Sequence, residues 1–139
     1  MKYGNIILEK KEYVYIKRIL NISGYSGDYQ IQKSLTKFFE ELKTAHILDE
    51  EDMPDDVVRL NSVVTVRSDN DWERTLQIVQ PMDKDLKNNK ISILTPMGTA
   101  LFGYSVEDTV KWEFPTGTKA LEIVEVVQME KDKNLDLHL

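Results

Sequence analysis

Few residues in this chain are of the types that usually carry out chemistry, and their spacing does not bring them together. The sequence has no cysteine, which excludes disulfides and cysteine-based zinc sites. A serine nucleophile needs a neighbouring base. His46 is expected near a helix end and His138 in a charged tail, so neither suits that role. The glycines are scattered and form no phosphate-binding loop. We therefore predict no catalytic residue, no cofactor and no metal site, and a protein that is not an enzyme.

Carboxylates form one dense run, DEEDMPDD at residues 49–56. A calcium-binding loop needs alternating oxygen ligands and a central glycine, and this run has neither. A turn explains it better, with Asp49 capping a short helical segment and Pro54 ending that segment. We interpret the run as a junction between two parts of the chain rather than as a cation site.

Chain length, net charge and the lengths of the apolar runs exclude further classes of function. A chain of 139 residues fits one domain, or a small domain with an appendage. Its net charge of -6 argues against unaided binding to a nucleic-acid backbone. No apolar run approaches the ~20 residues that a membrane helix needs, and the first residues do not have the pattern of a signal peptide. We expect a cytoplasmic protein without a membrane partner.

The elements that would position a site begin with two predicted helices. Tyr13, Ile16 and Leu20 lie at helical spacing. Apolar residues then recur in steps of four and three at positions 31, 35, 38, 42 and 45, which predicts a second helix of roughly 17 residues and roughly 25 Å. Turn formers at 21–28 predict a short connection and an antiparallel helical hairpin. The expected hairpin tip consists of Ser23, Gly24, Tyr25 and Asp28.

Charge is unevenly distributed along this half of the chain. Residues 1–37 contain seven basic and three acidic side chains, whereas residues 38–56 contain one basic and eight acidic ones. Two interpretations stay open for the basic part. It is either a face that meets RNA or an acidic protein surface, or an ordinary solvated face.

Residues 57–129 predict a β-rich unit. Apolar residues at 57–66 and 73–79, separated by a polar turn, indicate an antiparallel pair of strands. Residues 81–90 lack periodicity and are expected to form a loop. Two more strands are predicted at 109–114 and 118–129, and a slip of the apolar phase between Ile123 and Val124 indicates a β-bulge. Helices followed by strands are typical of an α+β fold with an antiparallel sheet.

A short helix is predicted within this unit. Ile91 and Ile93 alternate on a short strand. Thr95 suits the N-cap, and Pro96 suits the first helical position, where its missing N–H costs nothing. Gly103 is expected to stop the helix in a left-handed conformation. Local physical chemistry therefore explains the segment as a folding unit.

The order of motifs in residues 91–126 resembles the C-terminal domain of the GreA/GreB family of bacterial transcript-cleavage factors. The chain has Ile91-Ser92, then Thr95-Pro96 where the family has Ser-Pro, then ALFG, ED, PTG and LEIVEV in sequence. Residues 50–62, EEDMPDDVVRLNS, resemble the junction in the regulator of nucleoside diphosphate kinase branch, which follows a shortened hairpin. The resemblance implies a short helical hairpin at residues 1–53 and an FKBP-like domain at residues 54–139.

The resemblance also implies a partner, bacterial RNA polymerase. Family members dock at the rim of its secondary channel, and long-armed members insert a coiled coil whose two tip carboxylates help to hold a catalytic magnesium ion. The docking position carries over to Thr95 and Pro96, with Met97 and Gly98 adjacent, although Leu94 stands where GreB-type members have an acid. Any contact with RNA or DNA is expected to be indirect, through the polymerase.

The predicted hairpin departs from the long-armed members. It is short, and its tip has one carboxylate, Asp28, which equally suits a helix cap. Without two carboxylates, magnesium-assisted cleavage lacks its ligands. The expected function is polymerase binding without stimulation of cleavage, with exclusion of true cleavage factors from the channel. A genuine cleavage factor and an FKBP-like prolyl isomerase or chaperone are the alternatives.

Overall fold

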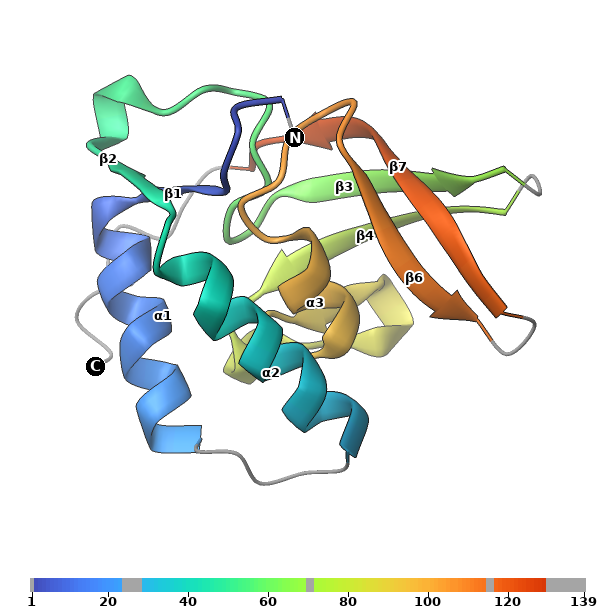
Figure 1. Ribbon diagram of the computed structural model, residues 1–139, viewed down its shortest axis with the longest axis horizontal. Coiled ribbons are helices and arrows are strands. Elements are labelled where there is room, and N and C mark those ends of the chain that lie inside the picture. The colour runs from blue at the N-terminus through green and yellow to red at the C-terminus, as the bar shows by residue number, and fades with distance from the viewer. Residues whose placement is uncertain (1, 24–28, 70–71, 115–116, 130–139) are drawn as a thin grey trace.

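The first four elements of the chain are two helices flanked by two short strands (Figure 1). The computed structural model describes residues 2–23, 29–69, 72–114 and 117–129. Strand β1 (Ile7–Glu9) leads into helix α1 (Lys10–Ser23), and helix α2 (Tyr29–Leu42) leads into strand β2 (His46–Leu48). β1 and β2 pair in parallel. Of the predicted hairpin tip, Ser23 ends α1, whereas Gly24, Tyr25 and Asp28 lie outside the described residues.

The second helix is shorter than the sequence pattern predicted. α2 has 14 residues and ends at Leu42, so Ala45 lies outside it. The backbone N–H groups of Lys43 and Thr44 donate to carbonyls three residues back, at 3.2 and 3.3 Å, which tightens the last turn. The N–H of His46 then donates to the carbonyl of Ile6 at 2.9 Å. Pairing with β1 therefore ends the helix before its apolar repeat ends.

The junction at residues 49–56 begins with the 3-10 turn η1 (Glu50–Asp52). Asp49 occupies the N-cap position, as predicted, but its side chain makes no capping hydrogen bond. The turn is instead closed through the backbone, because the N–H of Asp52 donates to the carbonyl of Asp49 at 3.0 Å. The carboxylate of Asp49 is therefore not needed to cap the turn.

The main sheet has five strands in the order β5-β4-β3-β7-β6. Their bounds are β3 Val63–Ser68, β4 Glu73–Val79, β5 Lys90–Ser92, β6 Thr109–Phe114 and β7 Gly117–Val127. β3 and β4 form the predicted antiparallel pair. β3 begins later than expected, because Asn61 takes a positive φ of 72° and turns the chain ahead of it.

The predicted β-bulge is present where β3 pairs with β7. Thr65 is opposite Glu125, and Val66 is opposite Ile123, so Val124 has no opposite residue. This extra residue shifts the inward-facing phase of β7 by one position. The shift in the apolar pattern of the sequence therefore corresponds to a real irregularity in the pairing of β3 with β7.

The expectation of a purely antiparallel sheet is wrong. β5 runs parallel to β4, with Gln77 opposite Lys90 and Val79 opposite Ser92. Residues 81–90, expected as a plain loop, contain the 3-10 turns η2 (Pro81–Asp83) and η3 (Leu86–Asn88), which carry the chain back along β4, and they end at Lys90, the first residue of β5. A parallel neighbour requires such a crossover rather than a tight hairpin. The protein is thus α+β with a mixed sheet.

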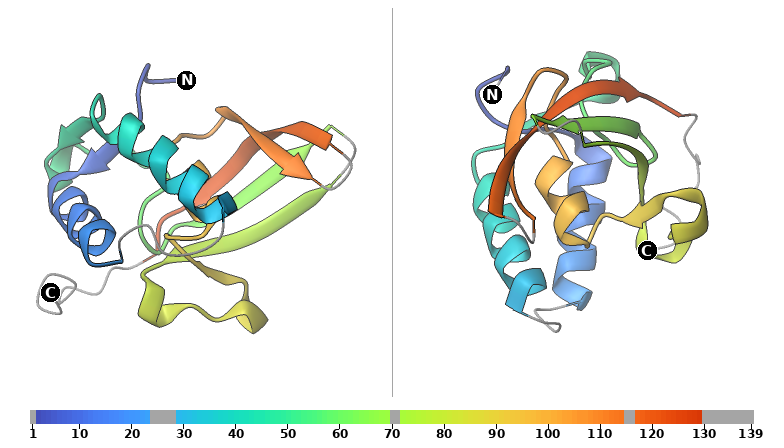
Figure 2. Two further views of the ribbon diagram at one scale, coloured as in Figure 1. Left: turned by 60° about the horizontal axis from the view of Figure 1, so that its bottom comes forward. Right: turned by 90° about the vertical axis from the view of Figure 1, so that its right-hand side faces the viewer.

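Helix α3 (Pro96–Leu101) lies between α2 and the sheet (Figures 1 and 2). Gly103 follows it with φ 85°, as predicted for a left-handed stop. A side chain at Gly103 would also collide with β1, because a Cβ there would lie 2.8 Å from the Cβ of Ile6. The N–H of Ile7 donates to the carbonyl of Gly103 at 3.0 Å, so β1 is fastened to the end of α3.

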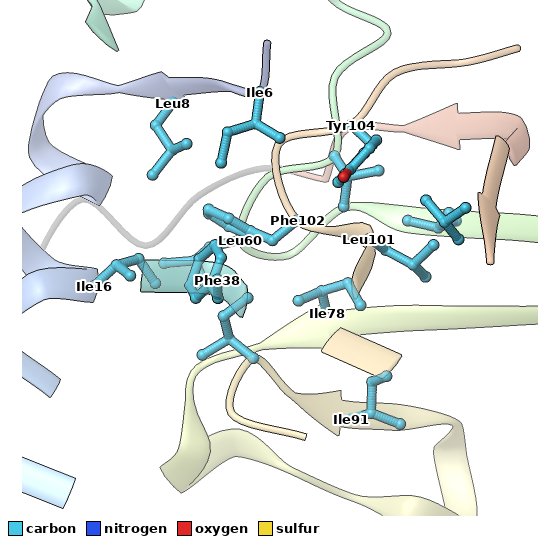
Figure 3. Close-up of a cluster of buried hydrophobic side chains, with 14 of the residues drawn as sticks. Ile6, Leu8, Ile16, Phe38, Leu60, Ile78, Ile91, Leu101, Phe102 and Tyr104 are labelled. Carbon is cyan, nitrogen blue, oxygen red and sulfur yellow. The ribbon is translucent and has the colours of Figure 1, made fainter. Parts of the chain in front are cut away.

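One hydrophobic core joins the two helices to the sheet (Figure 3). The ring of Phe38 on α2 meets the ring of Phe102 edge to face, with centroids 6.1 Å apart. Ile16 on α1 and Ile78 on β4 belong to the same buried cluster. The core draws on both sides of residues 53 and 54, where the sequence predicts a domain boundary, and that boundary stays a prediction. No helix of the described residues is long and apolar enough to cross a membrane.

Candidate protein-binding surface

The corner between β5 and α3 holds the four predicted docking residues in one place. We refer to residues 94–98 as the β5–α3 corner. Thr95 is the N-cap of α3: its hydroxyl accepts from the N–H of Gly98 at 3.1 Å and donates to the carbonyl of Ser92 at 2.7 Å. The hydroxyl of Ser92 in turn accepts from the N–H of Leu94 at 3.0 Å. Leu94 and Thr95 are therefore both hydrogen-bonded to Ser92 at the end of β5, and Thr95 also caps α3.

Exposure differs among these residues. Leu94, Thr95, Pro96 and Met97 are partly exposed, whereas Gly98 is buried. Met97 and Leu94 also pack against the hydrophobic core. Three of the predicted docking residues can therefore offer side-chain atoms to a partner, and Gly98 can only set the spacing behind them.

Gly98 allows α3 to lie directly against β5. A Cβ at this position would come within 2.5 Å of the carbonyl oxygen of Ser92 and 3.0 Å of the Cα of Ile93. Both atoms belong to the backbone, so relief would require the helix to move away from the strand. The close approach is what places Thr95 within hydrogen-bonding range of Ser92.

Replacing Gly98 with alanine is expected to destabilise the protein by about 2 kcal/mol, as overpacking of a filled site does. Helix propensity alone predicts the opposite sign, a gain of about 1 kcal/mol for alanine in a helix. Urea unfolding of the two proteins distinguishes these outcomes. A Gly98→Ala variant as stable as the wild type would show that the contact with β5 is not tight.

An ion-pair cluster that the sequence did not predict lies at the start of α1, where Arg59, Glu9 and Glu12 are buried and the side chain of Glu50 is 60% exposed. The guanidinium of Arg59, which is 6% exposed, donates to Glu12 at 2.9 Å and to both carboxylate oxygens of Glu50 at 2.8 and 2.9 Å. The carboxylate of Glu9 lies 4.0 Å from the same group. We refer to these four residues as the Arg59 cluster. It links α1 to η1 and to the segment before β3.

Glu9 and Glu12 have different tasks within this cluster. The carboxylate of Glu9 accepts from the N–H groups of Lys11 at 2.9 Å and Glu12 at 3.1 Å, so Glu9 caps α1. Burial raises the pKa of Glu12 to about 7, against the lowering effects of Arg59 and of a hydrogen bond from the backbone of Leu60. A buried carboxylate held by a buried guanidinium supports structure, and it offers no open position for a substrate.

Three further polar contacts join residues before position 54 to residues after it. The hydroxyl of Tyr104 donates to the carboxylate of Glu41 at the end of α2. The hydroxyl of Tyr3 donates to Asp56 at 2.9 Å, and the backbone N–H of Lys2 donates to Asp108 at 2.6 Å. Within the described residues, no group of three or more His, Cys, Asp or Glu side chains is arranged to hold a metal ion.

Comparison with known proteins places this arrangement among transcription factors. A family model described as "Transcription elongation factor, GreA/GreB, C-term" matches residues 53–128. The chain is 39% identical over 88 residues to the "Regulator of nucleoside diphosphate kinase" of Escherichia coli, covering 62% of this chain and 65% of that relative. It is 34% identical over 110 residues to "Transcription elongation factor GreA" of Pelobacter propionicus, covering 73% of this chain and 70% of that protein.

A solved structure extends the similarity to the helices. A "Prokaryotic transcription elongation factor GreA/GreB from Nitrosomonas europaea" matches with a TM-score of 0.72 and 31% identity, covering 89% of this chain and 98% of that one. The sequence match to the Escherichia coli regulator, by contrast, spans just under two thirds of its length, at 65%.

Proposed function

Because the chain belongs to the GreA/GreB family of transcription elongation factors, we propose that it binds bacterial RNA polymerase at the rim of the secondary channel without stimulating transcript cleavage. The proposal includes an FKBP-like domain at residues 54–139 after a helical hairpin at residues 1–53. It also places the protein where the polymerase works, in the cytoplasm. By occupying the rim, the protein excludes true cleavage factors.

The main support for the proposal is the structure of the β5–α3 corner. This corner lies within the part of the chain that the family model matches. Thr95 and Pro96 are partly exposed, and hydrogen bonds to Ser92 and the close approach at Gly98 hold them in place. A surface that is ordered before binding loses little conformational entropy when a partner docks on it. The corner is therefore suited to contact a partner of fixed shape.

The helices support the second part of the proposal, that the protein does not assist cleavage. α1 and α2 have 14 residues each, which corresponds to about 21 Å at 1.5 Å per residue. The segment that joins them, residues 24–28, has the sequence GYSGD with a single carboxylate, that of Asp28. Assisting a magnesium ion at the end of an arm requires an arm that reaches the reacting atoms and the carboxylates to hold the ion. The short helices and the single carboxylate in the sequence between them support a protein that does not assist cleavage.

We expect no release of RNA fragments from backtracked elongation complexes when the protein is added with magnesium. The measurement is the rate of release above that of polymerase alone, with a GreA-type factor as the positive control. The contrary result is clear release that disappears in an Asp28→Ala variant. That result would make the protein a cleavage factor whose single tip carboxylate suffices.

A further inference from the structure

The outward side of α1 carries a cationic stripe. Within residues 10–20 of this helix, the exposed positions are Lys10, Lys11, Val14, Lys17 and Arg18. Their spacing of one, three and four places them on one helix face. From Lys10 to Arg18 the stripe runs about 12 Å along the helix axis. The single acidic side chain within residues 10–20, that of Glu12, is buried.

The stripe exists because the acids of the same helix end point inward. Glu12, on α1, is 1% exposed, and Glu9, next to α1 in sequence, is 5% exposed. Both lie in the Arg59 cluster. The sequence alone shows a helix start of mixed charge, KKE after a glutamate. In the folded protein, Glu9 and Glu12 lie buried beside Arg59, and the basic side chains of the helix form a positive outer face.

The opposite side of α1 packs against the rest of the protein. Tyr15, Ile16, Ile19 and Leu20 are buried in the hydrophobic core. A helix that binds a lipid surface needs its apolar face free to insert. α1 can therefore offer a partner only the cationic stripe.

The composition of the stripe favours an acidic protein surface over a nucleic acid. Val14 is 49% exposed in the middle of the stripe, and phosphate oxygens offer no apolar contact to cover it. Nucleic-acid-binding domains are usually basic overall, whereas this chain has a net charge of -6. Three of the four cations are lysines, which lack the planar fork that arginine presents to phosphate.

We propose that the cationic stripe of α1 binds an acidic protein surface of RNA polymerase, as a second contact in addition to the β5–α3 corner. This inference rests on the proposed function, because it names a further surface for the same partner. The stripe attracts the partner over several ångströms and orients the helices, while the corner provides the close fit. Contacts of this type raise the association rate and give binding a steep dependence on salt.

The test is a charge reversal at Lys17 and Arg18, which lie on the half of the stripe remote from the acidic residues of η1. Binding of the K17E/R18E variant to core RNA polymerase is measured at low and at physiological salt. The matched control is R74E/K111E, which reverses one arginine and one lysine at exposed positions of β4 and β6. We expect about tenfold weaker binding for K17E/R18E at low salt, with a shallower salt dependence, and less than about a twofold change for the control.

The outcomes separate this inference from the proposed function. If the wild type binds polymerase and both variants bind equally well, the stripe is not a contact, while the docking proposal stands. If the wild type does not bind polymerase, both the proposed function and this inference are wrong. Binding of a single-stranded RNA oligomer in the absence of polymerase, lost in K17E/R18E but not in the control, would overturn the inference in favour of a phosphate ligand.

Discussion

Replacing Arg59 with methionine is expected to lower the free energy of unfolding by about 3–5 kcal/mol, because removing one partner of a buried ion pair leaves the other charge uncompensated. Methionine fills similar space but supplies no donor to Glu12, which is 1% exposed. The start of α1 would then lose its link to η1. Urea unfolding followed by circular dichroism measures the change.

The matched control for this variant is Arg67→Met. Arg67 pairs with Glu122 at 3.5 Å, and both side chains are about half exposed. Exposed pairs contribute roughly 0–1 kcal/mol, so this variant should unfold almost as the wild type does. If Arg59→Met is destabilised no more than Arg67→Met, the Arg59 cluster does not hold α1 in place.

The cost of Arg59→Met should also depend on pH. Arg59 lowers the pKa of Glu12, which burial raises to about 7 from an unfolded value of 4.5. A carboxyl whose pKa is raised on folding favours the native state at low pH, and this advantage is lost as pH rises through the folded pKa. Without the guanidinium the pKa rises further, so the variant should lose more stability at pH 8 than at pH 5. An equal loss at both values would show that Glu12 does not titrate in this range.

Changing Thr95 to aspartate is expected to weaken binding to core RNA polymerase by tenfold or more, with a smaller loss for Pro96→Ala. Aspartate is as good an N-cap as threonine, so the fold should be kept. The change places a negative charge on the partly exposed β5–α3 corner and removes the hydroxyl that donates to Ser92 at 2.7 Å. A charge within a docked surface must be desolvated without a partner, and about 1.4 kcal/mol corresponds to tenfold in affinity.

Thr95→Ser is the control for this prediction, because serine keeps both the accepting and the donating hydrogen bond of the cap. Its affinity should stay within about twofold of that of the wild type. Each variant is checked by its urea midpoint, so that loss of binding is not confused with unfolding. Full binding by a folded Thr95→Asp variant would remove the corner from the contact surface.

Elements set by local chemistry were predictable from the sequence. Strand β4 occupies residues 73–79 as its apolar alternation indicated, and the phase slip at Val124 located the bulge. The Thr95 cap and the Gly103 stop follow from residue preferences at helix ends. β1 and β2 were not predicted, because each has only three residues and their pairing joins Ile7 to His46, which are far apart in the sequence. β5 was placed correctly but not its parallel pairing, which depends on a crossover.

The long-range contacts could not be predicted from one sequence. Arg59 and Glu12 are 47 positions apart, and no local pattern indicates that a charge between Val58 and Leu60 will be buried. The requirement for glycine at position 98 could not be predicted either, because it comes from the close approach of the Ser92 carbonyl at the end of β5. The cationic stripe also depended on the fold, because it appears only once Glu9 and Glu12 have turned inward to Arg59.

A competition experiment on polymerase tests whether the protein occupies the channel rim without assisting cleavage. Backtracked elongation complexes are supplied with a fixed amount of a GreA-type factor and increasing amounts of this protein, and the rate of RNA fragment release is followed. We expect release to fall as the wild-type protein is added, and to stay high when the Thr95→Asp variant is added in its place. Release that is unchanged at saturating protein, or that rises with it, would contradict a factor that occupies the channel rim without assisting cleavage.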